Sequence, residues 1–421
     1  MKRETKYIVA QVVAPIYGAI LSYISFTDGL SVRTRLFLSA VFVLLFGIAF
    51  AQQIIKYYYL VIIFSLGILF QVLFYSQGSS LIGETAKKIY SAAYYWIFLC
   101  FGLLYLTQAV ERDTVRFVYY VILSIIFFTC ITTTIGLIAN PHASRLLAST
   151  SVQDYYESNI GGFGFIYSII FIAPVLLLIS YNTKDIFSLL TLIAVIGVTI
   201  LSQYTTAILL LILLIGGTFV FGFSLSSKQK KRRIFVLLAI VVIFLISAKL
   251  IGNLFFVIAR NINYPGLSFL RFRLYEVGES LTSLSPTGGA YDRFVRFSRS
   301  FEQFLKSPLL GTSVNNRRGL GGHSTFFDIL GGTGILGALF YYGVIGLVIR
   351  QQKIRGIPIW YLLIIWGGFF ILTLVNPIII GTNIFTLTVF STLGMNFLKS
   401  NEFDKTIHKQ KGRQFENSLA Y

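Results

Sequence analysis

The sequence predicts an all-α integral membrane protein with about twelve transmembrane helices and one long external loop. Hydrophobic residues make up 56% of the 421 residues and charged residues only 12%, about half of what soluble domains carry. Apolar runs of about twenty residues recur along the chain, and a helix needs this length to cross the hydrocarbon core. Solid apolar runs do not fit a β-barrel, whose strands are short and alternate in polarity.

The apolar runs give the expected spans in chain order. Their approximate centres are Ala14–Tyr23, Phe42–Phe50, Val61–Phe70, Ile97–Leu106, Ile122–Ile131, Ile166–Leu176, Leu189–Val198, Ile208–Phe219, Phe235–Ile246, Ile335–Val344, Leu362–Leu372 and Phe385–Met395. Only residues 202–205 separate Leu189–Val198 from Ile208–Phe219, which predicts a tight helical hairpin. The chain then divides into N-terminal spans (1–252), the long external loop (253–325), C-terminal spans (326–398) and a tail (399–421).

Lysine and arginine concentrate in one set of alternate loops. That set contains Lys2, Arg3, Lys6, Lys56, Arg112, Arg116, Lys184, the basic run 228–233, Arg350, Lys353, Arg355 and the tail after Lys399. By the positive-inside rule this side is cytoplasmic, with both termini on it. We therefore attribute the net charge of +19 first to basic loops that set the membrane topology and contact anionic lipid, and we infer no nucleic-acid partner.

The long external loop is rich in arginine and poor in lysine. It contains Arg260, Arg271, Arg273, Arg293, Arg296, Arg299, Arg317 and Arg318, with Lys306 as its only lysine. Arginine presents a planar fork that grips phosphate or carboxylate oxygens at two points. This composition favours a site for an anionic substrate. The alternative is that these arginines pair with acids of the loop and with lipid headgroups.

Three of these arginines, Arg293, Arg296 and Arg299, are spaced three apart and would share one face of a helix. Phe294, Phe297, Phe301, Phe304 and Leu305 would lie on or near the opposite side. The spacing therefore predicts an amphipathic helix that is able to lie on the membrane surface.

His323 is the only histidine of the long loop and stands just before an apolar helix. Histidine is easily tuned for proton transfer near neutral pH, although a lone histidine is usually structural. Thr325 and Asp328 have the spacing of a capping box at the start of this helix. A helix N-terminus is a natural anion site, and Gly331 and Gly337 permit close helix contact in lipid.

The sequence lacks the motifs of nucleotide-binding and zinc-binding proteins. Gly332-Thr-Gly334-Ile-Leu-Gly337 matches a dinucleotide fingerprint by letter, but it lies in a transmembrane run without a preceding strand. There is no Walker A loop, and His142, His323 and His408 do not have zinc-site spacing. We therefore expect no metal and no cofactor. Cys100 and Cys130 lie inside apolar runs, which predicts buried packing and not a disulfide framework.

A family resemblance rests on the segment Tyr291–Gly346. Arg293, Phe297, the turn Pro308-Leu-Leu-Gly311, His323 and the helix with Gly334-Ile-Leu-Gly337 resemble the O-antigen polymerase and O-antigen ligase superfamily. There, a long external loop carries an arginine, a Pro-x-x-Gly turn, and a histidine followed by an apolar helix with Gly-x-x-Gly.

Segment 140–145 is similar to capsular and exopolysaccharide polymerases of that superfamily. Two departures stand out: Ser324 occupies a position where asparagine is common, and hairpin 202–206 lacks the arginine of many ligases. The second departure favours a polymerase and leaves any role of the hairpin in doubt.

The resemblance implies a metal-independent glycosyltransferase of the bacterial cytoplasmic membrane. Such an enzyme joins oligosaccharide repeat units, carried on undecaprenyl diphosphate, at the outer face, and lipid diphosphate is the leaving group. The implied catalytic residues are His323 and Arg293. His323 would act as general base for the acceptor hydroxyl or would orient the donor, and Arg293 and Arg296 would hold the diphosphate. Weaker binding candidates are Arg299, Arg271, Arg273, Arg317, Arg318 and, on the acceptor side, Arg145. The implied partners are the lipid-linked oligosaccharide, membrane lipids, a chain-length regulator and a flippase.

Three alternatives remain open. A ligase would move finished glycan onto a terminal acceptor. A flippase or transporter for lipid-linked sugars would place charges along a central cavity within the spans, and such charges are few. A non-catalytic membrane scaffold is the third.

Overall fold

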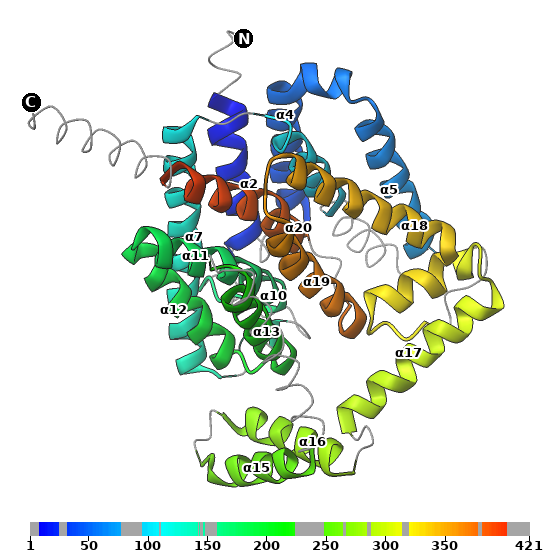
Figure 1. Ribbon diagram of the computed structural model, residues 1–421. Helices are drawn as coiled ribbons and strands as arrows, with labels where there is room; N and C mark the ends of the chain where they lie inside the picture. Colours follow the sequence, from blue (N-terminus) through cyan, green and yellow to red (C-terminus); the bar gives the residue numbers. More distant parts are fainter. Residues whose placement is uncertain are drawn as a thin grey trace, which may run out of the picture.

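The computed structural model describes residues 8–24, 32–76, 95–108, 111–141, 143, 146–147, 158–223, 248–263, 267–283, 288–313, 320–377 and 381–401. Every regular element in these ranges is a helix, which confirms the all-α prediction for the described part of the chain (Figure 1).

The N-terminal half contains η1 (Val9–Val13), α2 (Ala14–Tyr23), α4 (Val32–Lys56), α5 (Tyr59–Ser76), the helix Tyr95–Tyr105, α7 (Arg112–Ala139), α10 (Phe163–Ile169), η2 (Ile170–Ile172), α11 (Ala173–Thr183), α12 (Ile186–Leu201) and α13 (Thr205–Phe221). The C-terminal half contains α15 (Ala248–Asn261), α16 (Ser268–Ser283), α17 (Gly288–Lys306), η4 (Gly311–Ser313), α18 (Thr325–Ile354), α19 (Ile359–Val375), α20 (Gly381–Phe385) and η5 (Thr386–Phe390), which continues as helix to residue 401.

Three described helices are long and apolar enough to cross a membrane: Arg112–Ala139, Phe163–Thr183 and Thr325–Ile354. A bent pair inside α4 makes a fourth if it is one span, and several shorter apolar helices accompany them. The expected span centres that fall on described residues lie on helices, whereas Phe235–Ile246 lies outside the described residues. These helices are consistent with a membrane protein, and the number twelve stays a prediction.

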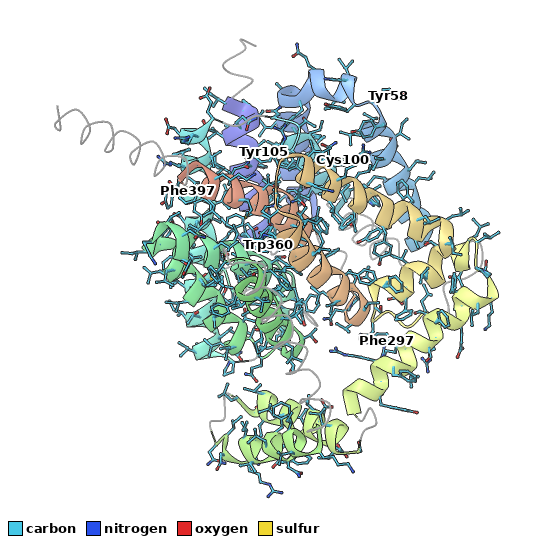
Figure 2. All side chains as sticks on the ribbon, in the orientation of Figure 1. Tyr58, Cys100, Tyr105, Phe297, Trp360 and Phe397 are labelled. Atoms are coloured by element: carbon cyan, nitrogen blue, oxygen red, sulfur yellow. The ribbon has the colours of Figure 1, made fainter. Side chains whose placement is uncertain are left out.

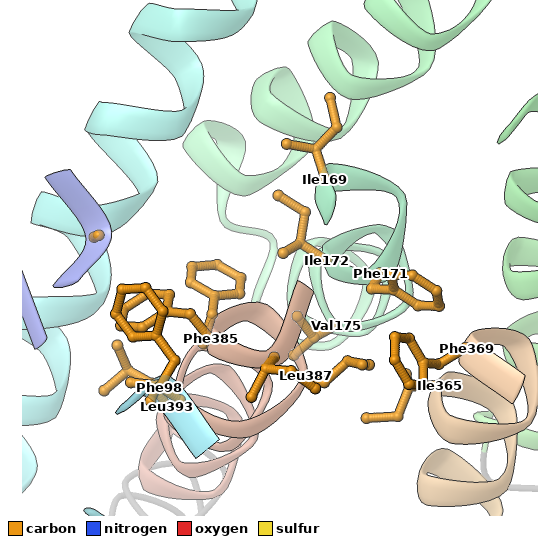
Figure 3. Close-up of a cluster of buried hydrophobic side chains, with 14 of the residues drawn as sticks. Phe98, Ile169, Phe171, Ile172, Val175, Ile365, Phe369, Phe385, Leu387 and Leu393 are labelled. Atoms are coloured by element: carbon orange, nitrogen blue, oxygen red, sulfur yellow. The ribbon is translucent and has the colours of Figure 1, made fainter. Parts of the chain in front are cut away.

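The segment α10–η2–α11 forms the centre of the buried core (Figure 3). Pro174 lies in the first turn of α11, where its missing N–H costs nothing, and one turn of 3₁₀ helix precedes it. From this centre Phe171 packs edge-on against Phe369 of α19, with ring centroids 6.2 Å apart. On the other side Phe385 packs against Phe98 at 5.4 Å. Cys100 and Cys130 are buried free thiols, as predicted.

The predicted loop 253–325 contains three helices in its described part. α15 and α16 pack side by side, and α17 leads from them to the start of α18 (Figure 1). Gly252 and Gly278 make this pairing close, because a Cβ on either would lie within 2.9 Å of the other's carbonyl oxygen. The loop is thus a folded structure that brings α17 against α18.

Candidate functional site

The predicted amphipathic helix is α17, and its arginine face is confirmed as helical. Arg293 is half-buried, whereas Arg296 and Arg299 are exposed. On the other face Phe297 stacks on Phe327 of α18 at a centroid distance of 5.6 Å, and Figure 2 labels Phe297 at this junction. Aromatic packing therefore holds α17 against the first turns of α18 and leaves Arg296 and Arg299 exposed.

The loop before His323 is docked directly on the backbone of α17. A Cβ on Gly321 would lie 2.0 Å from the carbonyl oxygen of Arg296, so only glycine fits there. The Gly321 N–H donates to Oγ of Ser300 at 2.9 Å. Ser300 in turn donates to Oδ1 of Asp328 at 2.6 Å, and the same carboxylate oxygen accepts from the Gly322 N–H at 3.1 Å. This network fixes the loop between α17 and α18.

The N-cap of α18 is Ser324 and not Thr325, which corrects the predicted capping box. Oγ of Ser324 accepts from the Phe327 N–H at 3.3 Å and donates to the Thr373 carbonyl at 3.0 Å. Asp328 lies one position too late to close a capping box, and its carboxylate serves the glycine loop. Because serine and asparagine are both strong N-caps, Ser324 keeps the capping function that asparagine would have at this position.

His323 is half-buried between this cap and the arginine face. Burial, and then the positive charges of Arg296 and Arg293, lower the pKa of His323 below its ordinary value of 6.5. The carboxylates of Asp328 and Asp292 act in the opposite direction but do not outweigh them. The imidazole is therefore neutral at neutral pH, the form that can accept a proton.

The hairpin between α12 and α13 takes part in the arrangement, contrary to the doubt that its missing arginine raised. It is as tight as predicted, since α12 ends at Leu201 and α13 begins at Thr205. Oε1 of the buried Gln203 accepts from the Leu270 N–H at 3.0 Å. Oγ1 of Thr206 accepts from Nη1 of Arg293 at 3.4 Å. The hairpin thus contacts both α16 and the first arginine of α17.

The Pro-x-x-Gly turn fits into a break in α18. Gly334 has φ 66° and ψ −166°, which leaves N–H groups of the following turn without partners in the helix. The carbonyl of Pro308 accepts from the Ile335 N–H at 2.8 Å, and that of Leu309 from the Leu336 N–H at 3.3 Å. Gly311 lies so close that its Cβ would be 2.3 Å from the Thr333 nitrogen. The turn, His323 and the glycine helix therefore form one packed unit.

The structure brings together Arg293, Arg296 and His323 of the predicted site residues. Arg299 lies one turn further along α17, and Arg271 is exposed on α16. Arg273 belongs to α16, but its side chain lies outside the described part. Arg317, Arg318 and Arg145 also lie outside the described residues.

Sequence reasoning missed Ser300, Gln203 and Thr206. Their roles depend on contacts between distant segments, and no local pattern marks them. Within the described ranges, no group of three or more His, Cys, Asp or Glu side chains could hold a metal ion.

Comparisons with protein-family models, curated proteins and solved structures gave no match.

Proposed function

We propose that this chain is a metal-independent glycosyltransferase that polymerises oligosaccharide repeat units carried on undecaprenyl diphosphate. The observation that carries the proposal is the docking of the loop before His323 on the backbone of Arg296, which sets the half-buried imidazole among the positive charges of Arg296 and Arg293. A proton acceptor thereby stands beside a double positive charge, as glycosyl transfer from a diphosphate requires.

The reaction needs both features at the same place. The acceptor hydroxyl oxygen attacks the anomeric carbon of the donor, and the bond from this carbon to the diphosphate oxygen breaks. His323 takes the hydroxyl proton, while the electron pair of the broken bond leaves on the lipid diphosphate. Arg293 and Arg296 stabilise the charge that develops there, as fixed cationic groups do in other phosphate-leaving reactions.

The opposite face of α17 suits the lipid part of such a donor. Phe294, Phe301 and Leu305 are 59%, 42% and 60% exposed, although they are large and apolar. A surface helix of this kind lies with its apolar side among acyl chains and its basic side at the headgroups. α17 would then hold the diphosphate at the level where a polyprenyl chain leaves the bilayer.

For the membrane arrangement we propose about twelve spans in the bacterial cytoplasmic membrane, with both termini cytoplasmic and the site outside. Arg355 and Lys399, predicted to be cytoplasmic, lie together, because Nζ of Lys399 donates to the Arg355 carbonyl at 3.2 Å. Arg355 follows the C-terminal end of α18, whereas His323 precedes its N-terminal end. This separation supports the proposed orientation.

A ligase that transfers finished glycan is the second candidate. The contact between Thr206 and Arg293 favours it, because it places hairpin 202–206 beside the site, and family ligases carry an arginine in this hairpin. The absence of that arginine here supports the polymerase. A flippase would also bind the diphosphate through arginines, but unlike a glycosyltransferase it needs no proton acceptor beside them.

The test is the surface glycan of a strain that lacks the gene, complemented with wild type, Arg293→Ala or His323→Ala. Arg260→Ala is the matched control, since Arg260 is an exposed arginine of α15. We expect single lipid-linked units with either site variant, long chains with the control, and equal protein levels in the membrane.

The other outcomes separate the candidates. Long chains that stay on the lipid carrier indicate the ligase, and units trapped on the cytoplasmic face indicate the flippase. Normal glycan from the deletion strain would refute the whole proposal.

A further inference from the structure

A second polar site lies at the end of the molecule far from His323. A cavity of about 320 Å³ opens there, next to Tyr105, which Figure 2 labels well away from Phe297. Its lining comes from four segments: the end of helix Tyr95–Tyr105, the start of α7, the end of α18 and the last helix. The polar side chains that line it are Gln108, Arg112, Arg355, Thr392, Asn396 and Ser400.

The cavity is positively charged. Arg112 and Arg355 line it, and its lining contains no carboxylate. Nε of Arg355 donates to the Leu106 carbonyl, and within the described residues this guanidinium makes no ion pair. Burial lowers the pKa of Arg355, as it does for a cation without a close counter-charge.

The start of α7 forms one wall of the cavity. α7 begins at Arg112, and its N-cap residue Glu111 makes no side-chain hydrogen bond to the first turn. The first turn also carries Asp113, so this helix terminus adds no net positive charge, and the positive charge of the lining comes from Arg112 and Arg355. The amide group of Asn396 supplies a further hydrogen-bonding group in the lining, whereas the hydroxyl of Ser400 donates to the Phe397 carbonyl at 2.8 Å.

We propose that this cavity binds the phosphate group of an anionic phospholipid. Two guanidinium groups and a neutral amide donor, that of Asn396, are groups that recognise phosphate. The surroundings favour a lipid over a free ion, because Ile354 and Ile359, on either side of Arg355 in the chain, are 65% and 52% exposed. Acyl chains can cover these side chains while the headgroup enters the cavity. The inference does not depend on the proposed glycosyl transfer.

The experiment uses the full chain in a zwitterionic detergent, with phosphatidylglycerol and phosphatidylcholine of equal chain length as probes. Thermal unfolding and native mass spectrometry report binding. We expect phosphatidylglycerol to bind and to raise the Tm, and phosphatidylcholine to do neither. Arg355→Gln should weaken phosphatidylglycerol binding about tenfold, because a charged hydrogen-bond donor is lost.

Three further variants make the result specific. Arg350→Gln is the matched control, because Arg350 is exposed on the same helix and does not line the cavity; it should bind like wild type. Arg355→Lys should keep much of the affinity. Asn396→Asp places a carboxylate in the cavity and leaves Arg355 in place. It should weaken phosphatidylglycerol binding, and it tests the inference if Arg355→Gln fails to fold.

Two results would overturn the inference. Equal binding of the two lipids would show that the cavity does not recognise an anionic headgroup. A Tm rise with inorganic phosphate as large as that with phosphatidylglycerol, at equal occupancy, would make the occupant a free anion and not a lipid.

Discussion

Replacing Gly321 with alanine should separate His323 from the arginine face. The new Cβ would lie 2.0 Å from the Arg296 carbonyl oxygen and 2.8 Å from the Arg296 Cα, where ordinary contact begins at 3.4 Å. Both atoms belong to the backbone of a helix and cannot rotate away. The loop must therefore retreat by about 1.4 Å, the difference between 3.4 and 2.0 Å.

Both stability and activity should suffer. Overpacking of this kind costs about 1–3 kcal/mol, and losing the hydrogen bond from the Gly321 N–H to Ser300 adds about 1 kcal/mol. Displacement by about 1 Å of a group that acts on the reacting atoms lowers a rate by roughly a hundredfold. The pKa of His323 should rise toward its ordinary value, since the charge of Arg296 is then further away.

The assay follows the reaction of neutral imidazole with diethyl pyrocarbonate against pH, read at the His323 peptide by mass spectrometry, together with glycan length in cells. Gly343→Ala is the control, because no atom lies within 4 Å of the added Cβ. A Gly321→Ala protein with an unchanged His323 titration and full-length polymer would refute the docking of this loop on α17.

Four other predictions concern distinct contacts. Arg296→Gln should shift the acid side of the pH–activity profile of polymerisation to higher pH, because the charge of Arg296 helps to lower the pKa of His323. An unchanged profile would exclude this coupling. The pKa of His323 is lower in the folded state than in the unfolded chain, so the protein has its full stability with respect to this group above about pH 6.5 and loses stability as the pH falls toward the lowered pKa. This loss is measured as the Tm of wild type against pH, compared with that of His323→Gln. Identical curves for the two proteins would contradict the prediction. Gln203→Ala should cost about 1–2 kcal/mol by leaving the Leu270 N–H unbonded and speed proteolysis near α16, and unchanged digestion would count against that contact. Gly334→Ala should lower the Tm through a strain of about 1–3 kcal/mol, because its backbone conformation is essentially limited to glycine; an equal Tm would show that the break is not needed.

The sequence predicted those parts of the site that depend on one helix. Arg293, Arg296 and Arg299 recur every three residues, and such spacing determines a shared helix face wherever that helix packs. The identity of the packed partner has no such local signature. The Ser300–Asp328 hydrogen bond joins α17 to α18 and exists only because Phe297 and Gly321 bring these helices together.

The errors have equally physical causes. Thr325 looked like a cap because it stands three residues before Asp328, yet Ser324 is held by the Thr373 carbonyl of α19, and this contact places the helix start one residue earlier. The sequence offered no sign that hairpin 202–206 contacts α17, and Thr206 accepts a hydrogen bond from Arg293 of that helix; whether the hairpin has a catalytic role stays open. The cavity beside Arg355 was not foreseen, since its lining comes from four separate stretches of sequence.

The break at Gly334 divides α18 into two lengths with different tasks. Residues 335–354 number twenty and measure about 30 Å along a helix, which equals the hydrocarbon thickness. The part after the break is therefore long enough to cross the bilayer alone. With the proposed orientation, Thr325–Thr333 and His323 would then lie in the headgroup layer or above it. On the proposed function, α18 would then hold the arginines of α17 at a fixed distance from the bilayer centre. On the same proposal, a donor with a shorter isoprenoid tail would present its diphosphate at this same height, so the site would select for the position of the phosphate and not for the length of the lipid.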